Sequence, residues 1–422
     1  MEFRLFRLID RHTSNVLFGD QWGYLASFFD STPFWRLYFQ QFGPHRQGLG
    51  FLINRIVFDA TNWSNKAEAF AIGATMSLAM IAAIVLKRQL FGSITGWDVA
   101  IPLIFLTWSQ FEIFIGSMNL APQAFPILLL IVYCLAWLER STRWRYFWVL
   151  VVNFLLLYSG YALLMGVVTL LLLLQECFRA KESGTERWSP FLALGLSLAE
   201  LGTFFIGYQF GYRSSCGIVS HSPLLILRYV ALMFASFVRL KGIGTVPTMA
   251  GVVLLGAAVW MTVRSLRELS SETGNHPEKR TLVILFGYSL IVSGAAAAGR
   301  LCLGIQYAQS SRYITYLIPA FLAFYFCLLN IKTSRLRSAA LICFLPAIAI
   351  PAIWLARVDN GTLTWLTLGK RRWQECYLKT EDINGCNAAT NFMVHPNPQA
   401  VQMKEKMEFL KLHHLNIYSD NP

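Results

Sequence analysis

The stretch AEAFAIGATMSLAMIAAIVL, residues 67–86, decides the fold, because it is apolar over almost its whole length and contains a single acid. A helix needs about 20 such residues to cross a bilayer. Nine further apolar segments of similar character follow, so the sequence predicts a bundle of about ten transmembrane helices. The ten segments are 67–86, 98–115, 121–138, 144–158, 161–176, 189–210, 245–263, 281–299, 313–331 and 338–356.

The composition of the whole chain supports this prediction. Hydrophobic residues make up 55% of the 422 residues and charged residues only 14%, whereas charged residues reach about 25% in soluble domains. Lipid offers no hydrogen-bond partners to the backbone, and the continuous apolar runs lack the alternation of a membrane β-barrel. We therefore expect an all-α polytopic membrane protein with three parts: a segment 1–66, a helix bundle 67–356 and a tail 357–422.

Two regions do not fit a simple series of spans. The run from Trp144 to Glu176 is too long for one helix and short for two, so we predict a break at Ser159-Gly160 and a tight hairpin. The apolar run 223–240 carries Arg228 at its middle. An unpaired arginine at bilayer depth is costly, so this run is interpreted as an interfacial or partly inserted helix within the segment 211–244.

The basic residues of the short loops predict the orientation, because cytoplasmic loops are enriched in Lys and Arg. If the first span runs inward, the segments 1–66, 211–244 and 300–312 and the tail 357–422 all lie outside. The net charge of +13 then reflects basic loops that face anionic lipid, and it requires no nucleic acid. The predicted cytoplasmic face receives Lys87, Arg88, Arg140, Arg143, Arg145, Arg179, Lys181, Arg187, Arg264, Arg267, Lys279, Arg280, Lys332, Arg335 and Arg337.

Seven of the eight cysteines separate into two groups. Cys376 and Cys386 lie ten residues apart in the polar tail, where an external location would allow a disulfide to form; two free thiols are the alternative. No CxxC, HExxH, P-loop, GxGxxG or DxD motif occurs, so zinc-dependent, ATP-driven and nucleotide-sugar chemistries lose their usual support. The cysteines interpreted as small buried hydrophobic residues are Cys134, Cys177, Cys302, Cys327 and Cys343.

The predicted external segments contain two groups of polar residues that could bind a ligand. In the first, Asp20 and Trp22 lie among aromatic residues, and the pair His45-Arg46 follows a Gly-Pro turn. Such residues can hold a polar ligand at the membrane surface. The structural alternative is an aromatic belt in which Asp20 caps a helix and Arg46 extends to lipid phosphates.

The second group flanks the predicted loop 300–312. Arg300 ends one span, and Arg312 and Tyr313 begin the next. Two guanidinium groups can together bind a phosphate or pyrophosphate, because their geometry matches phosphate oxygens bidentately. Either arginine alone would more simply be an interface anchor.

The tail is too small to be a catalytic domain with a core of its own. Its Lys-rich stretch from Pro398 to His413 has a helical pattern, so we expect a lid or a packing element. Glu381, Asp382 and His395 could be ligands, but a solvated surface is the simpler interpretation.

These features resemble the GT-C class of membrane glycosyltransferases, which take a sugar from a polyprenyl-phosphate donor on the extracytoplasmic face. The closer resemblance is to bacterial inner-membrane proteins with D-x-W, H-R, G-R and S-R-Y motifs, which here are Asp20–Trp22, His45-Arg46, Gly299-Arg300 and Ser311–Tyr313. Two features depart from the class. Members of the class begin with a span that precedes the first external loop, whereas this sequence starts at Met1 within that loop. We therefore expect either that the true start lies upstream or that the first helix is absent. The acidic pair of many members is reduced to Asp20, with Asp30 a less favoured substitute.

The resemblance implies a specific chemistry. Asp20 would be the general base for an acceptor hydroxyl of a glycan or lipid, and Arg300 and Arg312 would hold the departing phosphate. Trp22, His45, Arg46 and Tyr313 would help to bind the donor or the acceptor. No metal or other cofactor is required by the sequence, although a divalent cation on the phosphate is compatible with it.

A transporter or flippase for a lipid-linked or anionic solute is the main alternative. That class predicts polar residues at mid-membrane and discontinuous helices. Glu112 is the one acid well inside a predicted span, and Glu200 is another candidate. Glu112 would lie near the external end of its helix, however, where it could equally line a substrate cleft. An O-antigen-type polymerase, which would also use external arginines, ranks third.

Overall fold

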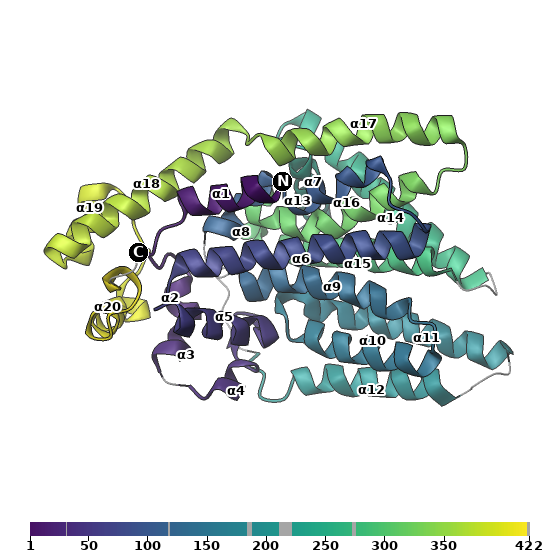
Figure 1. Cartoon of the computed structure of the whole chain (residues 1–422), viewed down its shortest axis with the longest axis horizontal. Coiled ribbons are helices and arrows are strands. Elements are labelled where there is room, and N and C mark those ends of the chain that lie inside the picture. The colour runs from purple at the N-terminus through teal and green to yellow at the C-terminus, as the bar shows by residue number, and fades with distance from the viewer. Residues whose placement is uncertain (31, 117–118, 184–187, 211–221, 272–275, 420–422) are drawn as a thin grey trace.

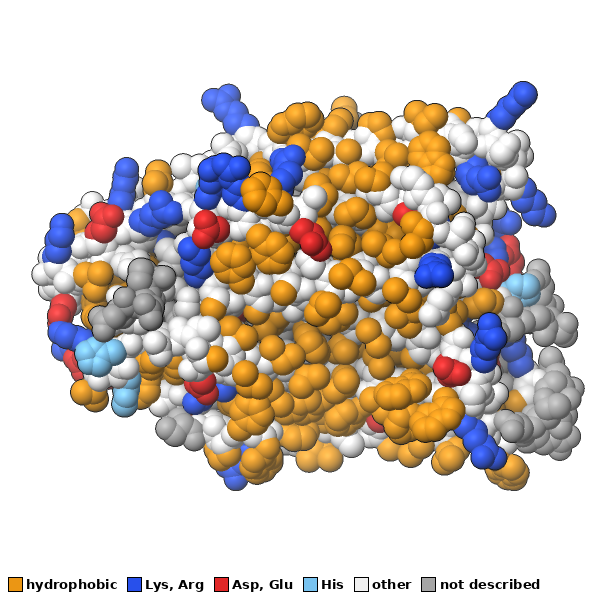
Figure 2. Space-filling view, viewed as in Figure 1, with side chains coloured by type: hydrophobic (Ala, Val, Ile, Leu, Met, Phe, Trp, Pro, Cys, Tyr) orange, Lys and Arg blue, Asp and Glu red, His pale blue; other side chains and the backbone are white. Residues whose placement is uncertain are grey.

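The computed structural model describes residues 1–30, 32–116, 119–183, 188–210, 222–271 and 276–419. Its long helices lie side by side and roughly parallel, while the small helices near both chain termini gather at one end of the bundle (Figure 1). We call this the cavity end. A broad belt of hydrophobic side chains covers the middle of the bundle, with charged side chains mainly toward the two ends (Figure 2).

Eight helical segments of the described chain are long and apolar enough to cross a membrane. They coincide with eight of the ten segments that the sequence predicts, so the all-α membrane-helix class is confirmed. The segments contain α6 (Asn65–Phe91), η1 (Gly96–Val99) with α7 (Ala100–Phe105), η2 (Trp108–Gln110) and α8 (Phe111–Ile115), η3 (Leu120–Ala124) with α9 (Phe125–Trp137), η4 (Gly160–Leu164) with α11 (Met165–Ser183), α14 (Thr245–Ser271), α15 (Pro277–Arg300) with η5 (Leu301–Leu303), η7 (Ser311–Tyr313) with α16 (Ile314–Leu329), and α17 (Ser334–Ile353).

The other two predicted spans are shorter helices. α10 (Thr142–Leu157) has 16 residues and α12 (Trp188–Phe204) has 17. Both pack within the bundle, α10 against α9 and α12, and α12 against α11. The predicted break at Ser159-Gly160 is present, because α10 ends at Leu157. Gly160 has a φ of +57°, a backbone conformation that favours glycine.

The predicted span 98–115 is not continuous. Its helix breaks between Phe105 and Trp108, and the side chain of Gln110 donates a hydrogen bond of 2.6 Å to the freed carbonyl of Phe105. Ser109 donates to the carbonyl of Pro351 on α17 at 2.8 Å. A broken helix is tolerated inside a bundle when such partners satisfy its backbone, but hydrophobicity alone does not reveal the break.

The ambiguous run 223–240 forms α13 (Pro223–Phe237), which has 15 residues. At about 1.5 Å per residue it reaches about 22 Å, which is less than the hydrocarbon thickness of about 30 Å. Its second half is buried, and α13 packs tightly on α14, where a side chain on Gly251 would collide with the carbonyl of Ala231. Arg228 donates to the carbonyl of Ile243 at 2.6 Å. These features agree with partial insertion; residues 211–221 of the predicted segment lie outside the described residues.

The N-terminal segment consists of short elements at the cavity end. The exception is α1, which lies along α6 (Figure 1). The two strands form an antiparallel hairpin in which Phe42 faces His45. The elements are α1 (Glu2–His12), α2 (Gln21–Tyr24), α3 (Ala26–Phe29), α4 (Phe34–Leu37), β1 (Gln41–Phe42), β2 (His45–Arg46) and α5 (Gly48–Ala60).

The tail folds back onto the N-terminal segment. The backbone N–H of Gly19 donates to Val394 at 2.8 Å, and the Lys406 ammonium donates to the carbonyl of Trp22 at 2.6 Å. Lys370 is buried and donates to the carbonyls of Ile115 and Gly116 at the end of α8, both at 3.1 Å. The tail is therefore a docked packing element, as predicted. Its elements are α18 (Arg357–Thr380), α19 (Ile383–Thr390), η8 (Gln399–Val401), α20 (Met403–Leu412) and η9 (Asn416–Tyr418). One further short helix, η6 (Ile305–Gln309), lies outside the tail and packs against α13.

At the opposite end of the bundle, some of the predicted loop cations are buried. Lys87 forms an ion pair of 2.8 Å with Asp98, and Arg280 pairs with Glu176. These pairs join α6 to η1 and α15 to α11, so the two cations also stabilise the bundle. Arg187 lies outside the described residues, and the orientation of the chain remains a prediction.

Candidate functional site

A cavity of about 310 Å³ lies at the cavity end of the bundle. Four parts of the chain that are far apart in sequence contribute to it: the N-terminal segment, the region of α8 and η3, the region of η4, α15 and α16, and α18. Its polar and aromatic lining is typical of a site for a polar ligand. The lining residues are Phe18, Gly19, Asp20, Tyr24, Phe42, His45, Gln47, Glu112, Gly116, Asn119, Pro122, Gln123, Tyr161, Arg300, Arg312, Tyr313, Tyr316, Thr362, Trp365 and Leu366.

Six of the eight residues that the sequence singles out for catalysis or substrate binding line this cavity. They come from segments separated by as many as about 290 positions, so their meeting is a property of the tertiary structure. These residues are Asp20, His45, Glu112, Arg300, Arg312 and Tyr313.

Asp20 lies at the N-terminal boundary of α2 and is exposed. Its side chain does not cap the helix, and it forms no hydrogen bond or ion pair with any residue that the structure describes. The carboxylate is close enough to Arg312 for the two charges to attract each other. An unengaged carboxylate at the edge of a cavity is available to accept a proton from a bound ligand.

Arg300 and Arg312 supply positive charge to the cavity. Arg300 ends α15 and lies against the phenol of Tyr161. The Nε of Arg312 donates to the Ser310 hydroxyl at 3.2 Å, and its guanidinium carbon lies 5.9 Å from the centre of the Tyr313 ring. Within the described chain, neither arginine forms an ion pair with a carboxylate. Both guanidinium groups therefore retain donors for an anionic ligand.

Glu112 has a structural role in the cavity wall. One carboxylate oxygen accepts hydrogen bonds from the hydroxyls of Ser310 and Ser311, both at 2.7 Å, and from the backbone N–H of Arg312 at 3.0 Å. The backbone N–H of Glu112 donates to Ser311 at 3.2 Å. The acid thus fixes the turn that carries Arg312. Glu112 also lines the cavity, so its predicted role in substrate binding stays a prediction.

Replacing Glu112 with Ala should destabilise the protein and disorder the Arg312 turn. Three donors would lose a charged acceptor, and hydrogen bonds to charged groups contribute about 1.5–3 kcal/mol each. We expect a clear fall in the thermal unfolding temperature. Glu112→Gln keeps one carbonyl acceptor and should lie between Ala and the wild type. Equal unfolding temperatures for all three proteins would contradict this role.

His45 lies on β2, with its ring 4.3 Å from the ring of Tyr161. Burial lowers the pKa of His45 to about 4, and the positive charge of Arg300 adds to the shift. The imidazole is therefore neutral near pH 7 and can both donate and accept a hydrogen bond.

The low pKa of His45 predicts how stability depends on pH. Between about pH 6.5 and 4 the unfolded chain binds a proton at this position and the folded chain does not, so the free energy of unfolding falls as the pH drops through this window. His45→Gln should make the unfolding temperature less sensitive to pH between 7 and 5. His413→Gln, on the tail surface, is the control. If both variants keep the wild-type pH dependence, His45 is not buried as described.

Trp22 and Arg46 do not line the cavity, so their assignment to ligand binding needs correction. Trp22 is 1% exposed, and its indole N–H donates to the carbonyl of Leu17 at 3.1 Å. Arg46 donates to the carbonyls of Phe39, Phe204 and Ile206. The tryptophan is part of the core, and the arginine joins the N-terminal segment to the end of α12.

Several lining residues were not predicted. Tyr161 and Tyr316 place aromatic rings and hydroxyls beside the arginines, with their ring centres 5.6 Å apart. Thr362, Trp365 and Leu366 come from α18, which closes one side of the cavity. The tyrosines lie in apolar runs that look like ordinary membrane helices, so the sequence carries no signal that separates them from the core. Asp30 does not line the cavity.

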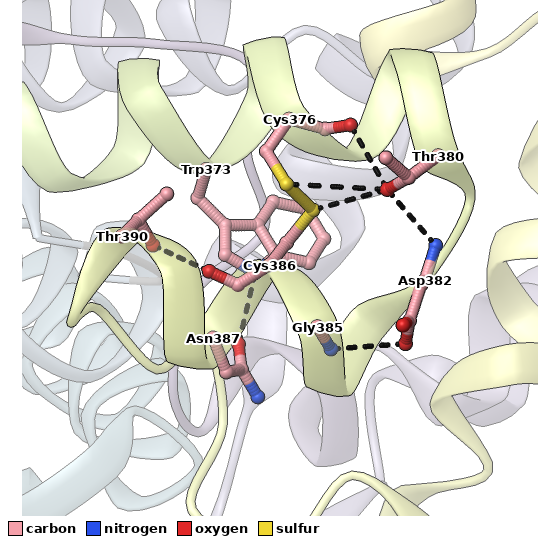
Figure 3. Close-up of a disulfide and its surroundings, with 8 residues drawn as sticks. All are labelled: Trp373, Cys376, Thr380, Asp382, Gly385, Cys386, Asn387 and Thr390. Atoms are coloured by element: carbon pink, nitrogen blue, oxygen red, sulfur yellow. Dashed lines mark hydrogen bonds between the residues drawn. A yellow bond between two sulfur atoms is a disulfide. The ribbon is translucent and has the colours of Figure 1, made fainter.

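The disulfide between Cys376 and Cys386 joins α18 to α19 and packs near Trp373 (Figure 3). Asp382 caps α19 by accepting from the N–H of Gly385 at 3.0 Å, and Glu381 pairs with Lys411. Neither acid belongs to the cavity.

Other cysteines differ from their prediction. Cys302, which was interpreted as a small buried hydrophobic residue, is disulfide-bonded, and Cys343 is exposed. Cys302 follows Arg300 closely in the chain, so the disulfides of Cys302 and of the tail both belong to the cavity end. Among the described residues, no group of three His, Cys, Asp or Glu side chains is arranged to hold a metal ion.

Comparison with protein-family models, with curated proteins and with solved structures gives no match to this chain. The fold and the cavity by themselves define the class of the protein. It is an all-α bundle with helices able to cross a membrane and a polar cavity at one end. Any assignment of activity depends on the geometry of that cavity.

Proposed function

We propose that this protein is a membrane glycosyltransferase that transfers a sugar from a polyprenyl-phosphate donor to a glycan or lipid acceptor. The observation that carries the proposal is the meeting of Asp20, His45, Arg300 and Arg312 around one cavity. Such a transfer needs an acid able to accept a proton and guanidinium groups able to bind phosphate. Within the part of the chain that the structure describes, Arg300 and Arg312 have no ion-pair partner and can fill the second role.

The chemistry balances without a cofactor. The acceptor hydroxyl attacks the anomeric carbon of the sugar as its proton passes to the Asp20 carboxylate. The bond between the anomeric carbon and the phosphate oxygen breaks, and its electron pair remains on the phosphate. Arg300 and Arg312 stabilise the negative charge that develops there. Neutral His45 orients the acceptor or the sugar through hydrogen bonds.

The extracytoplasmic side of a bacterial inner membrane is the proposed location of the cavity. The disulfides of Cys302 and of Cys376 with Cys386 support this orientation, because disulfides persist in oxidising compartments. The basic loops at the opposite end agree with the rule that cytoplasmic loops are positively charged.

The test is glycan transfer by the purified full-length protein in lipid nanodiscs, with a radiolabelled polyprenyl-phosphate sugar as donor. Formation of glycosylated acceptor together with free polyprenyl phosphate supports the proposal. A donor that stays intact across a range of sugars and acceptors would argue against it.

Transport of a lipid-linked or anionic solute remains the second candidate. The break between α7 and η2 favours it, since discontinuous helices frame the binding sites of many transporters. Proteoliposomes that move an intact lipid-linked solute without transferring its sugar would select this function.

A further inference from the structure

A second hollow lies at the cavity end, between α4 and the adjoining ends of α10 and α12. Aromatic and aliphatic side chains form most of its surface, and Trp35 and Ile206 are 62% and 73% exposed. We call it the α4 groove. It is lined by Trp35, Arg36, Phe39, Phe154, Tyr158, Thr203 and Ile206.

The α4 groove continues onto the lipid-facing surface of the bundle. Phe147 on α10 and Leu196 on α12 are about half exposed, at 48% and 46%. Hydrophobic side chains cover the region of α10 and α12 in the space-filling view (Figure 2), and α4 lies beside one end of α12 (Figure 1). Apolar surface of α10 and α12 therefore adjoins the groove.

The charge of the groove is positive. Arg36 is exposed, its guanidinium carbon lies 5.2 Å from the centre of the Trp35 ring, and it has no ion-pair partner among the described residues. Arg46 lies behind the groove, where it donates to three carbonyl groups and forms no ion pair with a carboxylate of the described chain. Glu200, one helical turn earlier on α12, accepts a hydrogen bond of 2.7 Å from Asn153 and does not line the groove.

The groove and the cavity share a wall. Successive side chains of a strand point to opposite faces, and on β2 this directs His45 to the cavity and Arg46 to the groove side. Gly48, just after β2, packs so closely on the carbonyl of Tyr158 that a side chain there would collide with it. A ligand in the groove would therefore also support the strand that carries His45.

We propose that the α4 groove binds an anionic glycerophospholipid of the surrounding bilayer, with its phosphate on Arg36 and one acyl chain along the apolar wall. An arginine beside an aromatic, apolar surface complements a phosphate attached to a hydrocarbon chain. No carboxylate belongs to the described lining of the groove, which favours an anionic headgroup over a zwitterionic one.

The test measures binding of dioleoyl phosphatidylglycerol to the delipidated full-length protein by native mass spectrometry. We expect one tightly bound lipid on the wild type, with dioleoyl phosphatidylcholine binding more weakly. Arg36→Gln should weaken phosphatidylglycerol binding about 10- to 100-fold, the effect of losing hydrogen bonds to a charged group. Because Arg36 is exposed, this variant should fold. Arg7→Gln, another exposed arginine at the protein surface, should bind like the wild type.

Two results would overturn the proposal. Equal binding of both phospholipids, unchanged by Arg36→Gln, would mean that the groove does not select a phosphate headgroup. Displacement of phosphatidylglycerol from the groove by polyprenyl phosphate at much lower concentration would assign the groove to the lipid of the sugar donor. Neither readout depends on sugar transfer, so failure here is distinct from failure of the proposed activity.

Discussion

Replacing Asp20 with Asn should reduce sugar transfer by about 10²- to 10⁴-fold, the usual contribution of a general base, and leave the protein folded. Asparagine keeps the shape of the side chain but cannot take the hydroxyl proton. The Asp20 carboxylate makes no hydrogen bond or ion pair within the described chain, so its charge is not needed to hold the fold. The measurement is kcat with purified protein and a polyprenyl-phosphate donor, alongside the thermal unfolding temperature.

Asp30→Asn is the matched control, because Asp30 lies in the same N-terminal segment but outside the cavity. It should retain full activity. If the Asp20 variant transfers sugar normally while the Asp30 variant does not, the role of base passes to Asp30. If both are active, neither acid is the base and the mechanism proposed above is wrong.

The second large effect is expected for Arg312→Gln, which should lower kcat/KM about 10- to 100-fold. Hydrogen bonds to charged groups contribute about 1.5–3 kcal/mol, and the charge on the leaving phosphate grows as the bond to the sugar breaks. The guanidinium group of Arg312 donates only to Ser310 among the described residues, so most of its donors are available to the ligand. Arg312→Lys keeps the charge and loses the bidentate geometry, and it should lie between Gln and the wild type.

Binding of polyprenyl phosphate, measured by calorimetry, separates two contributions of Arg312. A loss of affinity equal to the loss in kcat/KM would mean that the arginine binds substrate and transition state equally. A larger loss in kcat/KM would place its effect in the transition state. Arg7→Gln, away from the cavity, should change neither the affinity for polyprenyl phosphate nor kcat/KM. If the Arg312 variant binds and transfers like the wild type, Arg312 is not part of the site.

The sequence predicts the membrane helices well because their signal is local. A run such as residues 67–86 has no alternative to a helix in lipid, since every backbone group must be satisfied within the segment. The break between Phe105 and Trp108 was not predicted. It depends on partners from elsewhere, such as the carbonyl of Pro351 on α17, and no local pattern contains that information.

The site residues show the same distinction between local sequence signals and contacts with distant residues. Asp20, Arg300 and Arg312 stand out because charged residues are scarce in this chain, and the cavity brings them together. Arg46 stood out for the same reason, yet its side chain points away from the cavity, because neighbouring residues of β2 face opposite sides. Glu112 lines the cavity, but its hydrogen bonds to the Ser310-Ser311-Arg312 turn give it a positioning role.

By itself the sequence determined the class of the protein, because hydrocarbon admits helices whose backbone groups are paired internally and rejects most other structures. It also singled out the charged residues that are costly to keep near lipid. Only the tertiary structure decided which of them share a cavity, since contacts among residues 20, 112, 161, 312 and 365 depend on how distant helices pack. The direction of each side chain was decided there too. Burial, as at Trp22, and hydrogen bonding to remote carbonyls, as at Arg46, outweigh any local preference.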